Sequence, residues 1–146
     1  GGAGAVGSST AFALMDSSLV GEIVLVDIDD ERAAGEAMDL NHGAYFTSSV
    51  TVRSGGYEDC WDADVVIVTA GASQRPEETR LDLLERNADI FAEMIPEVTA
   101  GLNDDAVLLV VTNPVDVLSH VAWQVSDLPA ERVIGSGTVK FGISSP

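Results

Sequence analysis

Apolar runs alternate along the chain with segments in which apolar residues recur at helical spacing. Five short runs rich in β-branched residues predict strands at residues 22–28, 50–52, 64–70, 106–112 and 132–135. The middle runs are apolar throughout, which is typical of parallel strands buried on both faces. The segments between them predict helices at residues 30–42, 79–102 and 114–125. Strands that alternate with helices predict an α/β fold with a doubly wound parallel sheet.

The longest predicted helix has one apolar face. Its apolar side chains recur at helical spacing and predict core packing at Leu81, Leu84, Ala88, Phe91 and Ile95. Pro96 predicts a kink or a break inside this helix, and Gly101 is a natural stop signal.

The stretch "GGAGAVG" at the start of the chain has no predicted strand before it. In a doubly wound sheet the strand that leads into such a glycine loop is central. We therefore expect a fold without its first strand, in which the strands on either side of that position face a gap.

Composition narrows the class of protein. The 146 residues predict one domain, and 24 acidic against seven basic residues give a net charge of −17, which disfavours nucleic acid as a partner. No apolar run is long enough for a membrane span, and no export signal is visible. The single cysteine, Cys60, fits a reducing compartment, so we expect a cytoplasmic protein with no membrane partner. No metal site is predicted.

The glycine loop fits the pattern G-x-G-x-x-G through Gly2, Gly4 and Gly7. Such a loop permits a tight turn, close approach of the backbone to a pyrophosphate, and tight packing of the following helix. Asp27 ends the next predicted strand 20 residues after Gly7, where a carboxylate accepts hydrogen bonds from an adenosine ribose. An acid there repels a 2′-phosphate. The pattern therefore predicts NAD as the cofactor, and a flexible glycine turn is the alternative.

The polar loop "GASQRPEET" after the strand at 64–70 leads into Arg80 at the start of a helix. Ligands of open α/β sheets lie beyond the carboxyl ends of the strands, and the length of this loop suggests a flexible lid. Arg80 is poorly placed for the helix dipole, whose positive end prefers acids. Arg80 either serves a ligand carbonyl or carboxylate, or it faces solvent and pairs with Glu77 or Glu78.

Asn113 and Asp116 pose a similar choice in the stretch "VVTNPVDVL". The amide of Asn113 follows a buried strand, so it either points into the ligand crevice or caps the next turn. Asp116 fits the acidic position in the first turn of the following helix.

Five stretches together resemble one family: "GAGAVG", "MDLNHG", "TAGASQRPEETRLDLLERN", "TNPVDVLSHVAW" and "RVIGSGT". They are similar to the cofactor-binding part of the L-lactate dehydrogenases, within the lactate/malate dehydrogenase superfamily. The resemblance implies a Rossmann domain at residues 1–139 and hydride transfer between NAD and a 2-hydroxy or 2-oxo acid. It also implies a cytoplasmic homotetramer that acts in glycolysis and pyruvate fermentation. Residues 140–146 depart from the family, which continues there into a substrate domain.

The resemblance assigns roles to individual residues. It implies that NAD contacts the glycine loop and further positions, namely Gly2, Gly4, Val6, Gly7, Asp27, Arg32, Tyr57, Gly71, Ala72, Asn113 and Ser136. Arg80 is implied to polarise the substrate carbonyl, and Asn113 and Asp116 to lie beside the substrate. Gln74 takes the position at which malate enzymes carry an arginine for the second carboxylate. An uncharged Gln74 leaves that carboxylate unpaired and favours pyruvate, whereas a shift of one residue would give the role to Arg75 and favour oxaloacetate.

The acid/base histidine of the family has no counterpart in the chain. His42 and His120 are expected to be structural, and Phe141 and Pro146 occupy positions at which the family has charged residues. Hydride transfer needs a matched proton transfer, so we expect very slow turnover by this chain alone. The leading interpretation is the NAD-binding part of an L-lactate dehydrogenase. Part of a malate dehydrogenase and a non-catalytic NAD-binding module are the alternatives.

Overall fold

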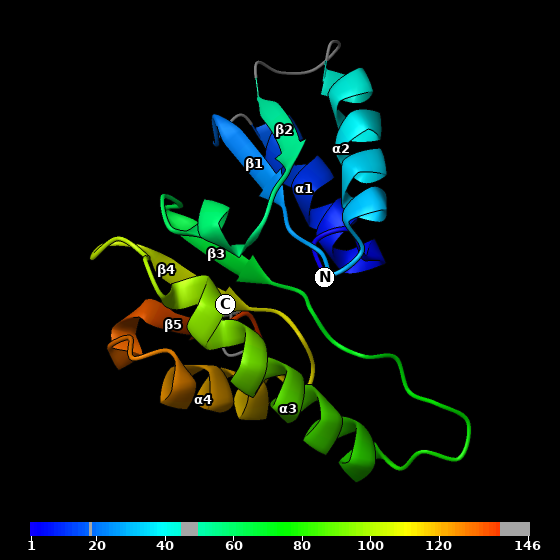
Figure 1. The fold of residues 1–146 in the computed structure, drawn as a ribbon, viewed down its shortest axis with the longest axis vertical. Helices are drawn as coiled ribbons and strands as arrows, with labels where there is room; N and C mark the ends of the chain where they lie inside the picture. Colours follow the sequence, from blue (N-terminus) through cyan, green and yellow to red (C-terminus); the bar gives the residue numbers. More distant parts are fainter. Residues whose placement is uncertain (18, 45–49, 138–146) are drawn as a thin grey trace, which may run out of the picture.

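The computed structural model describes residues 1–17, 19–44 and 50–137, and its strands form two parallel sheets. In the first sheet β1 (Glu22–Leu25) pairs with β2 (Thr51–Ser54). In the second, β4 (Val107–Val110) lies between β3 (Val65–Val68) and β5 (Val133–Gly135). No pairing joins β1 to β3 within the described ranges, and Figure 1 shows the two sheets as separate groups. The predicted gap in the sheet is confirmed.

Each sheet has its own pair of helices (Figure 1). Helices α1 (Ala5–Ser17) and α2 (Asp30–Ala44) pack on β1 and β2. Helices α3 (Arg80–Thr99) and α4 (Val115–Val125) pack against each other, and α4 contacts β4 and β5. All predicted strands and helices are present. β1, β3, β4 and β5 are shorter than predicted, whereas β2 extends to Ser54, two residues beyond its predicted end. The sequence did not predict two short 3₁₀ helices, η1 (Tyr57–Cys60) and η2 (Ala130–Arg132).

The hydrophobic core is divided in the same way as the sheet. The core of the first unit consists of Ala11, Met15, Leu25, Ala37, Leu40, Val50 and Val52. The core of the second unit consists of Val68, Ala70, Phe91, Ile95, Leu108, Val110, Leu118 and Ala122. Burial of these side chains supplies the main driving force for folding in each unit.

Helix α3 departs from its predicted pattern at two places. Phe91 and Ile95 are fully buried as predicted, but Leu81 is 62% exposed. The prediction for Leu81 was wrong because it lies in the first turn of α3, which extends beyond the strands in Figure 1. The helix also continues through Pro96 to Thr99, so the predicted break there is wrong.

The first residues of the chain connect the two sheets. The backbone N–H of Gly2 donates to the carbonyl of Val26, just after β1, at 2.8 Å. The hydroxyl of Thr69, just after β3, donates to the carbonyl of Gly1 at 3.0 Å. The start of the glycine loop is therefore held at the carboxyl ends of both strands.

Two further observations concern the extent of the chain. The predicted domain boundary after residue 139 and the atypical segment 140–146 lie outside the described residues. Among the helices that the structure describes, none is long and apolar enough to cross a membrane.

Candidate cofactor and substrate site

The candidate cofactor residues follow the carboxyl ends of all five strands. Asp27 follows β1, Tyr57 follows β2, and Gly71 and Ala72 follow β3. Asn113 and Ser136 follow β4 and β5 in the same way. The carboxyl ends of parallel strands lie at one edge of a sheet, and ligands of open α/β folds bind at that edge. The topology therefore brings residues from distant parts of the sequence to the ligand-binding edge.

The N-terminus of α1 is suited to a phosphate group. Within the described chain, the backbone N–H groups of Ala5, Val6 and Gly7 have no hydrogen-bond acceptor, and the first helical turn has no acidic residue. Free N–H groups and the helix dipole both favour an anion at such a helix end. A Cβ atom on Gly7 would overlap the carbonyl of Gly2, so only glycine permits this packing of helix and loop. The loop thus fits a pyrophosphate.

Asp27 lies beside this loop. Its Oδ2 accepts a hydrogen bond from the N–H of Ala3 at 3.0 Å, and its Oδ1 accepts one from the N–H of Asp29 at 3.2 Å. Burial by itself would raise the pKa of Asp27, but the hydrogen bond from Asp29, the N-terminal ammonium of Gly1 and the bond from Ala3 hold that pKa below its ordinary value. Asp27 is therefore an anion at neutral pH.

Three further candidate cofactor residues are Arg32, Tyr57 and Val6. Arg32 lies exposed in the first turn of α2, and its charge also lowers the pKa of Asp27. The pKa of Tyr57 is raised, first by burial and then by negative charges that include Asp27. Val6 is 53% exposed. Asp27, Arg32 and Tyr57 thus share one electrostatic environment.

The turn at Gly71 and Ala72 is held from two sides. The Oδ1 atom of Asn87, in α3, accepts a hydrogen bond from the N–H of Ala72 at 2.8 Å. On the other side, the hydroxyl of Thr112, after β4, donates to the carbonyl of Ala70 at 2.7 Å. A Cβ atom on Gly71 would lie 2.7 Å from the methyl group of Thr112, which is too close for a side chain. The turn can therefore present only backbone at this point.

Sequence analysis missed Asn87. Its side chain is 2% exposed, between the apolar positions Leu84 and Phe91 of the predicted core face. A polar residue at a core position of an amphipathic helix needs a hydrogen-bond partner, and that requirement was a usable signal. The partner itself, the amide of Ala72, could not be read from the pattern.

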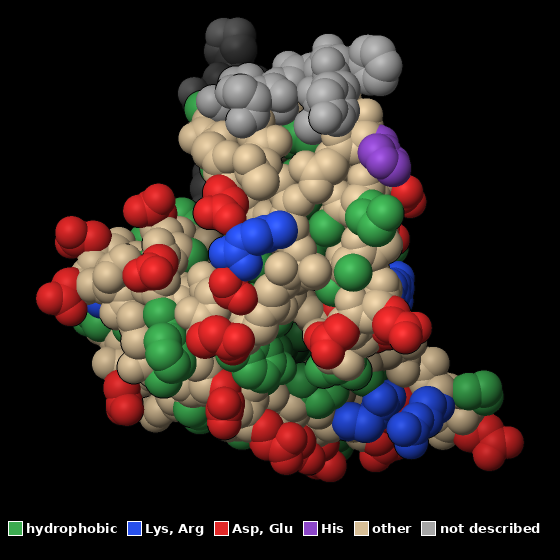
Figure 2. All heavy atoms as spheres, turned by 45° about the horizontal axis from the view of Figure 1, so that its top comes forward, with side chains coloured by type: hydrophobic (Ala, Val, Ile, Leu, Met, Phe, Trp, Pro, Cys, Tyr) green, Lys and Arg blue, Asp and Glu red, His purple; other side chains and the backbone are tan. Residues whose placement is uncertain are grey.

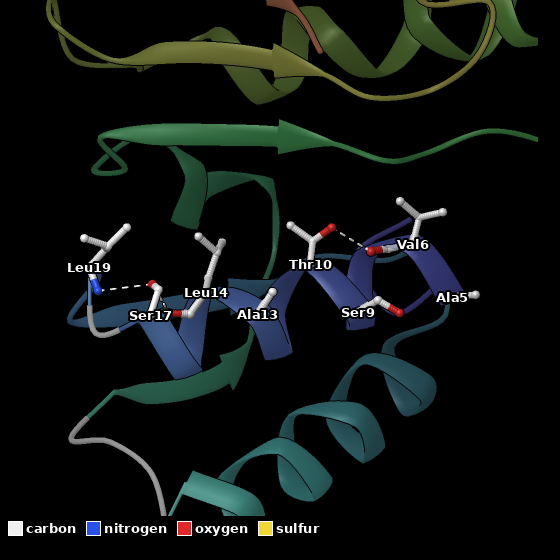
Figure 3. Close-up of a pocket in the computed structure, with 8 residues that line it drawn as sticks. All are labelled: Ala5, Val6, Ser9, Thr10, Ala13, Leu14, Ser17 and Leu19. Atoms are coloured by element: carbon white, nitrogen blue, oxygen red, sulfur yellow. Dashed lines mark hydrogen bonds between the residues drawn. The ribbon is translucent and has the colours of Figure 1, made fainter. Parts of the chain in front are cut away.

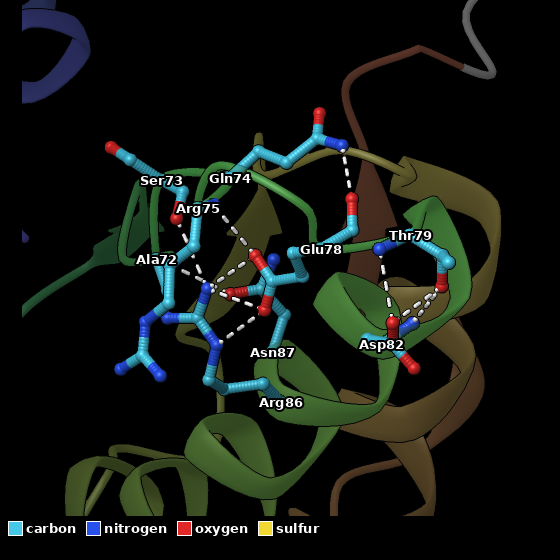
Figure 4. A network of polar contacts seen from close by, with 9 residues as sticks. All are labelled: Ala72, Ser73, Gln74, Arg75, Glu78, Thr79, Asp82, Arg86 and Asn87. Carbon is cyan, nitrogen blue, oxygen red and sulfur yellow. Dashed lines mark hydrogen bonds and ion pairs between the residues drawn. The ribbon is translucent and has the colours of Figure 1, made fainter.

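The loop between β3 and α3 has a compact polar network, shown in Figure 4. Glu78 forms an ion pair with Arg86 at 2.8 Å, and its carboxylate accepts the N–H of Arg75 at 2.8 Å. The side-chain amide of Gln74 donates to the carbonyl of Glu78 at 2.8 Å. Hydrogen bonds from Arg86 and then from Arg75 lower the pKa of Glu78. Gln74 is therefore tied to its own loop in this conformation.

The three remaining substrate candidates are all exposed. Arg80 is the first residue of α3 and, among the described residues, takes part in no ion pair, because Glu78 is paired with Arg86. Asn113 does not cap α4, since the N-cap is Pro114 and no side chain bonds there. The capping interpretation of Asn113 was therefore wrong. Asp116 lies in the first turn of α4, as predicted.

A hollow of about 590 Å³ lies along α1 and includes only Val6 among the candidate residues. Figure 3 shows Val6, Thr10 and Leu14 pointing from α1 toward β3. Figure 2 shows acidic side chains scattered over the face it presents rather than gathered in one patch. The described residues contain no group of three or more His, Cys, Asp or Glu side chains that could hold a metal ion.

Comparison with known proteins assigns the chain to a family. Residues 1–135 match the family described as "lactate/malate dehydrogenase, NAD binding domain". The chain belongs to the lactate/malate dehydrogenase family. The predicted resemblance and the predicted α/β fold are confirmed, and NAD is the cofactor of this family of domains.

Individual relatives are lactate dehydrogenases. The chain is 55% identical over 138 residues to L-lactate dehydrogenase 1 of Clostridium acetobutylicum, a match that covers 94% of the chain and 44% of that relative. A lactate dehydrogenase structure from a Medee basin deep-sea metagenome library has a TM-score of 0.86 and 48% identity, covering 90% of this chain and 42% of that one. The minor L-lactate dehydrogenase of Enterococcus mundtii, in its ligands-bound form, has a TM-score of 0.83 and 46% identity, covering 88% and 41%.

This lactate/malate dehydrogenase domain therefore spans less than half the length of the relatives it matches. The match to the family, over residues 1–135, contains every predicted site residue except Ser136. The match to L-lactate dehydrogenase 1 of Clostridium acetobutylicum extends over 138 residues.

Proposed function

We propose that the chain is the NAD-binding part of an L-lactate dehydrogenase, with residues 1–139 as its cofactor unit. The bound nicotinamide would exchange a hydride with the C2 atom of pyruvate or lactate. The proposal includes the cytoplasmic location, the homotetramer and the role in glycolysis and pyruvate fermentation that the resemblance implies. The names of the relatives support the L-lactate assignment.

One observation carries the cofactor proposal: the contact between Asp27 and the glycine loop. The anion at Asp27 lies one hydrogen bond from Ala3, and the free N–H groups of Ala5, Val6 and Gly7 follow directly. A dinucleotide needs a carboxylate for its ribose and N–H donors for its pyrophosphate. Asp27 would bind the adenosine ribose, and the start of α1 would bind the pyrophosphate.

Titration of the 146-residue chain with NADH and NADPH tests the cofactor proposal. Saturable binding of NADH, and weaker binding of NADPH because Asp27 repels the 2′-phosphate, are expected. A folded chain that binds neither nucleotide would overturn the proposal. The non-catalytic NAD-binding module predicts the same binding, so a second experiment must address the substrate.

The substrate proposal rests on residues at the strand ends and on the loop. We assign Arg80 to the polarised carbonyl of pyruvate, and Asn113 and Asp116 to the neighbouring substrate surface. Among the residues that the structure describes, Arg80 forms no ion pair and is exposed, which supports this role because its guanidinium is available to a ligand. Gln74 is uncharged and therefore disfavours a second carboxylate on the substrate.

A chimera that joins residues 1–139 to the C-terminal part of a relative tests the substrate. We expect the chimera to prefer pyruvate to oxaloacetate, and Gln74→Arg to shift the preference toward oxaloacetate. Arg75→Gln is the matched control and should leave the preference unchanged. A chimera that prefers oxaloacetate until Arg75 is replaced would favour the malate dehydrogenase alternative, and an inactive chimera that still binds NADH would favour the non-catalytic module.

A further inference from the structure

Two consecutive residues of α3 hold the start of the loop that follows β3 (Figure 4). Asn87 accepts the N–H of Ala72 at 2.8 Å, and Arg86 donates from Nη2 to the carbonyl of Ser73 at 3.0 Å. Asn87 is 2% exposed, so water has little access to the oxygen that accepts this N–H. Adjacent positions of one helix therefore bind adjacent positions of the loop.

Arg86 also binds the end of the same loop, through Glu78. Its Nε and Nη2 atoms donate to the Glu78 carboxylate at 3.0 and 2.8 Å. The same carboxylate accepts the N–H of Arg75, and the carbonyl of Glu78 accepts the side-chain amide of Gln74. Arg86 thus connects the first part of the loop to the segment just before Arg80.

We propose that Arg86 and Asn87 are positioning residues that set the conformation of this loop. Asn87 fixes the turn at Gly71 and Ala72, against which the cofactor would lie. Arg86, through Glu78, fixes the segment that carries Gln74 and leads to Arg80. Both act through the loop and contact no ligand themselves. The inference rests on the proposed function for its consequence, but its structural part can be tested separately.

The geometry favours this interpretation over a purely structural one. A structural asparagine in a helix needs only some partner for its amide, whereas Asn87 accepts a backbone N–H of the turn itself. Thr112 closes the opposite side of that turn, with its methyl group against Gly71. The turn is therefore clamped between α3 and the segment after β4, and loss of one side should free it.

Amide hydrogen exchange of the 146-residue chain, resolved by residue in NMR spectra, tests the structural part. Asn87→Leu should speed exchange at Ala72 by about five- to tenfold, since one net hydrogen bond is lost. Asn87→Asp keeps the acceptor oxygen and should restore protection. Glu78→Gln should speed exchange at Arg75, and Glu85→Gln, an exposed neighbour on α3, should change neither amide.

Binding of NADH tests the functional part in the same variants. Asn87→Leu should raise the Kd of NADH by about fivefold, and Asn87→Asp should recover most of that loss. Arg86→Gln replaces a partly exposed side chain without disturbing the core, and it provides the test if Asn87→Leu does not fold. It should speed exchange at Arg75 and weaken binding.

The outcomes separate the two proposals. Unchanged exchange at Ala72 in Asn87→Leu, or at Arg75 in Arg86→Gln, would overturn the positioning role. Faster exchange with an unchanged Kd for NADH would also overturn it, because the order of the loop would then have no effect on cofactor binding. A wild-type chain with protected Ala72 that binds no NADH would overturn the proposed function instead.

Discussion

The carboxylate of Asp27 accepts a hydrogen bond from the backbone N–H of Ala3 at 3.0 Å. The acid at the end of β1 therefore touches the glycine loop that precedes α1, although the two residues are 24 positions apart. One carboxylate oxygen is engaged by the loop, and the other accepts the N–H of Asp29. Asp27 thus has a part in shaping the loop as well as its proposed part in binding ribose.

We expect Asp27→Asn to weaken NADH binding and to reduce the preference for NADH over NADPH. The amide keeps the shape but loses the charge, and hydrogen bonds to charged groups contribute about 1.5–3 kcal/mol. This corresponds to a rise of roughly ten- to a hundredfold in the Kd of NADH. Isothermal titration with both nucleotides measures the change. Asp39→Asn, an exposed acid on α2, is the control and should bind NADH as the wild type does.

Gly7 and Gly35 should respond in opposite ways to the same added methyl group. In Gly7→Ala the Cβ atom overlaps the Gly2 carbonyl, so the glycine loop must move and NADH binding should be lost. In Gly35→Ala nothing lies within 4 Å of the new Cβ, and the α2 helix should gain about 0.5–1 kcal/mol of stability. Urea unfolding and NADH titration measure both effects. Equal NADH affinities in the two variants would contradict this account of the loop.

The fold was largely predictable from sequence because periodicity and strand composition are local properties. The runs around Val66 and Leu108 predicted parallel strands, which the structure contains as β3 and β4. The predicted burial holds for Leu108 in β4, whereas β3 is only partly buried. Even the gap between β1 and β3 followed, since the glycine loop has no predicted strand before it. Leu81 was mispredicted because spacing along a helix does not show where the helix extends past the sheet.

The site was predictable only where residues follow strands. Asp27 and Asn113 were predicted as site residues because the ends of parallel strands share an edge, a rule that needs no coordinates. Asn87 and Arg86 were missed because their partners are backbone groups of a loop, and sequence patterns carry no information on such contacts. The pairing of Glu78 with Arg86 rather than Arg80 likewise depends on the path of the loop.

Glu77 has a φ of 71°, in the left-handed region that favours glycine. A side chain in that conformation costs about 1–2 kcal/mol, and glycine avoids this cost. Glycine also gives the unfolded chain more conformational freedom, which offsets part of the gain in stability. Glu77→Gly should therefore raise the free energy of unfolding by about 0.5–1 kcal/mol, as measured in urea.

Glu85→Gly is the matched control for Glu77→Gly. Glu85 lies inside α3, where glycine is destabilising by about 1 kcal/mol. The two substitutions should thus change stability in opposite directions. A loss of stability in both variants would show that the left-handed conformation at Glu77 costs the protein nothing.

Asp82 should make α3 sensitive to acid. Its Oδ2 atom accepts the hydroxyl of Thr79 at 2.7 Å and the N–H of Thr79 at 2.9 Å, and these bonds, the hydroxyl first, lower the pKa of Asp82. A lowered pKa adds stability above the ordinary value of about 3.9, and this stability is lost as pH falls through the lowered value.

Asp82→Asn should therefore lower the urea midpoint at pH 7, and the difference from the wild type should shrink as the pH falls below about 4. The asparagine keeps an acceptor oxygen but has no charge near the positive end of the helix dipole. Asp89→Asn, on an exposed part of the same helix, should show no comparable pH-dependent difference. If Asp82→Asn destabilises equally at pH 7 and pH 3, the carboxylate charge does not stabilise α3, and the cap acts through its shape alone.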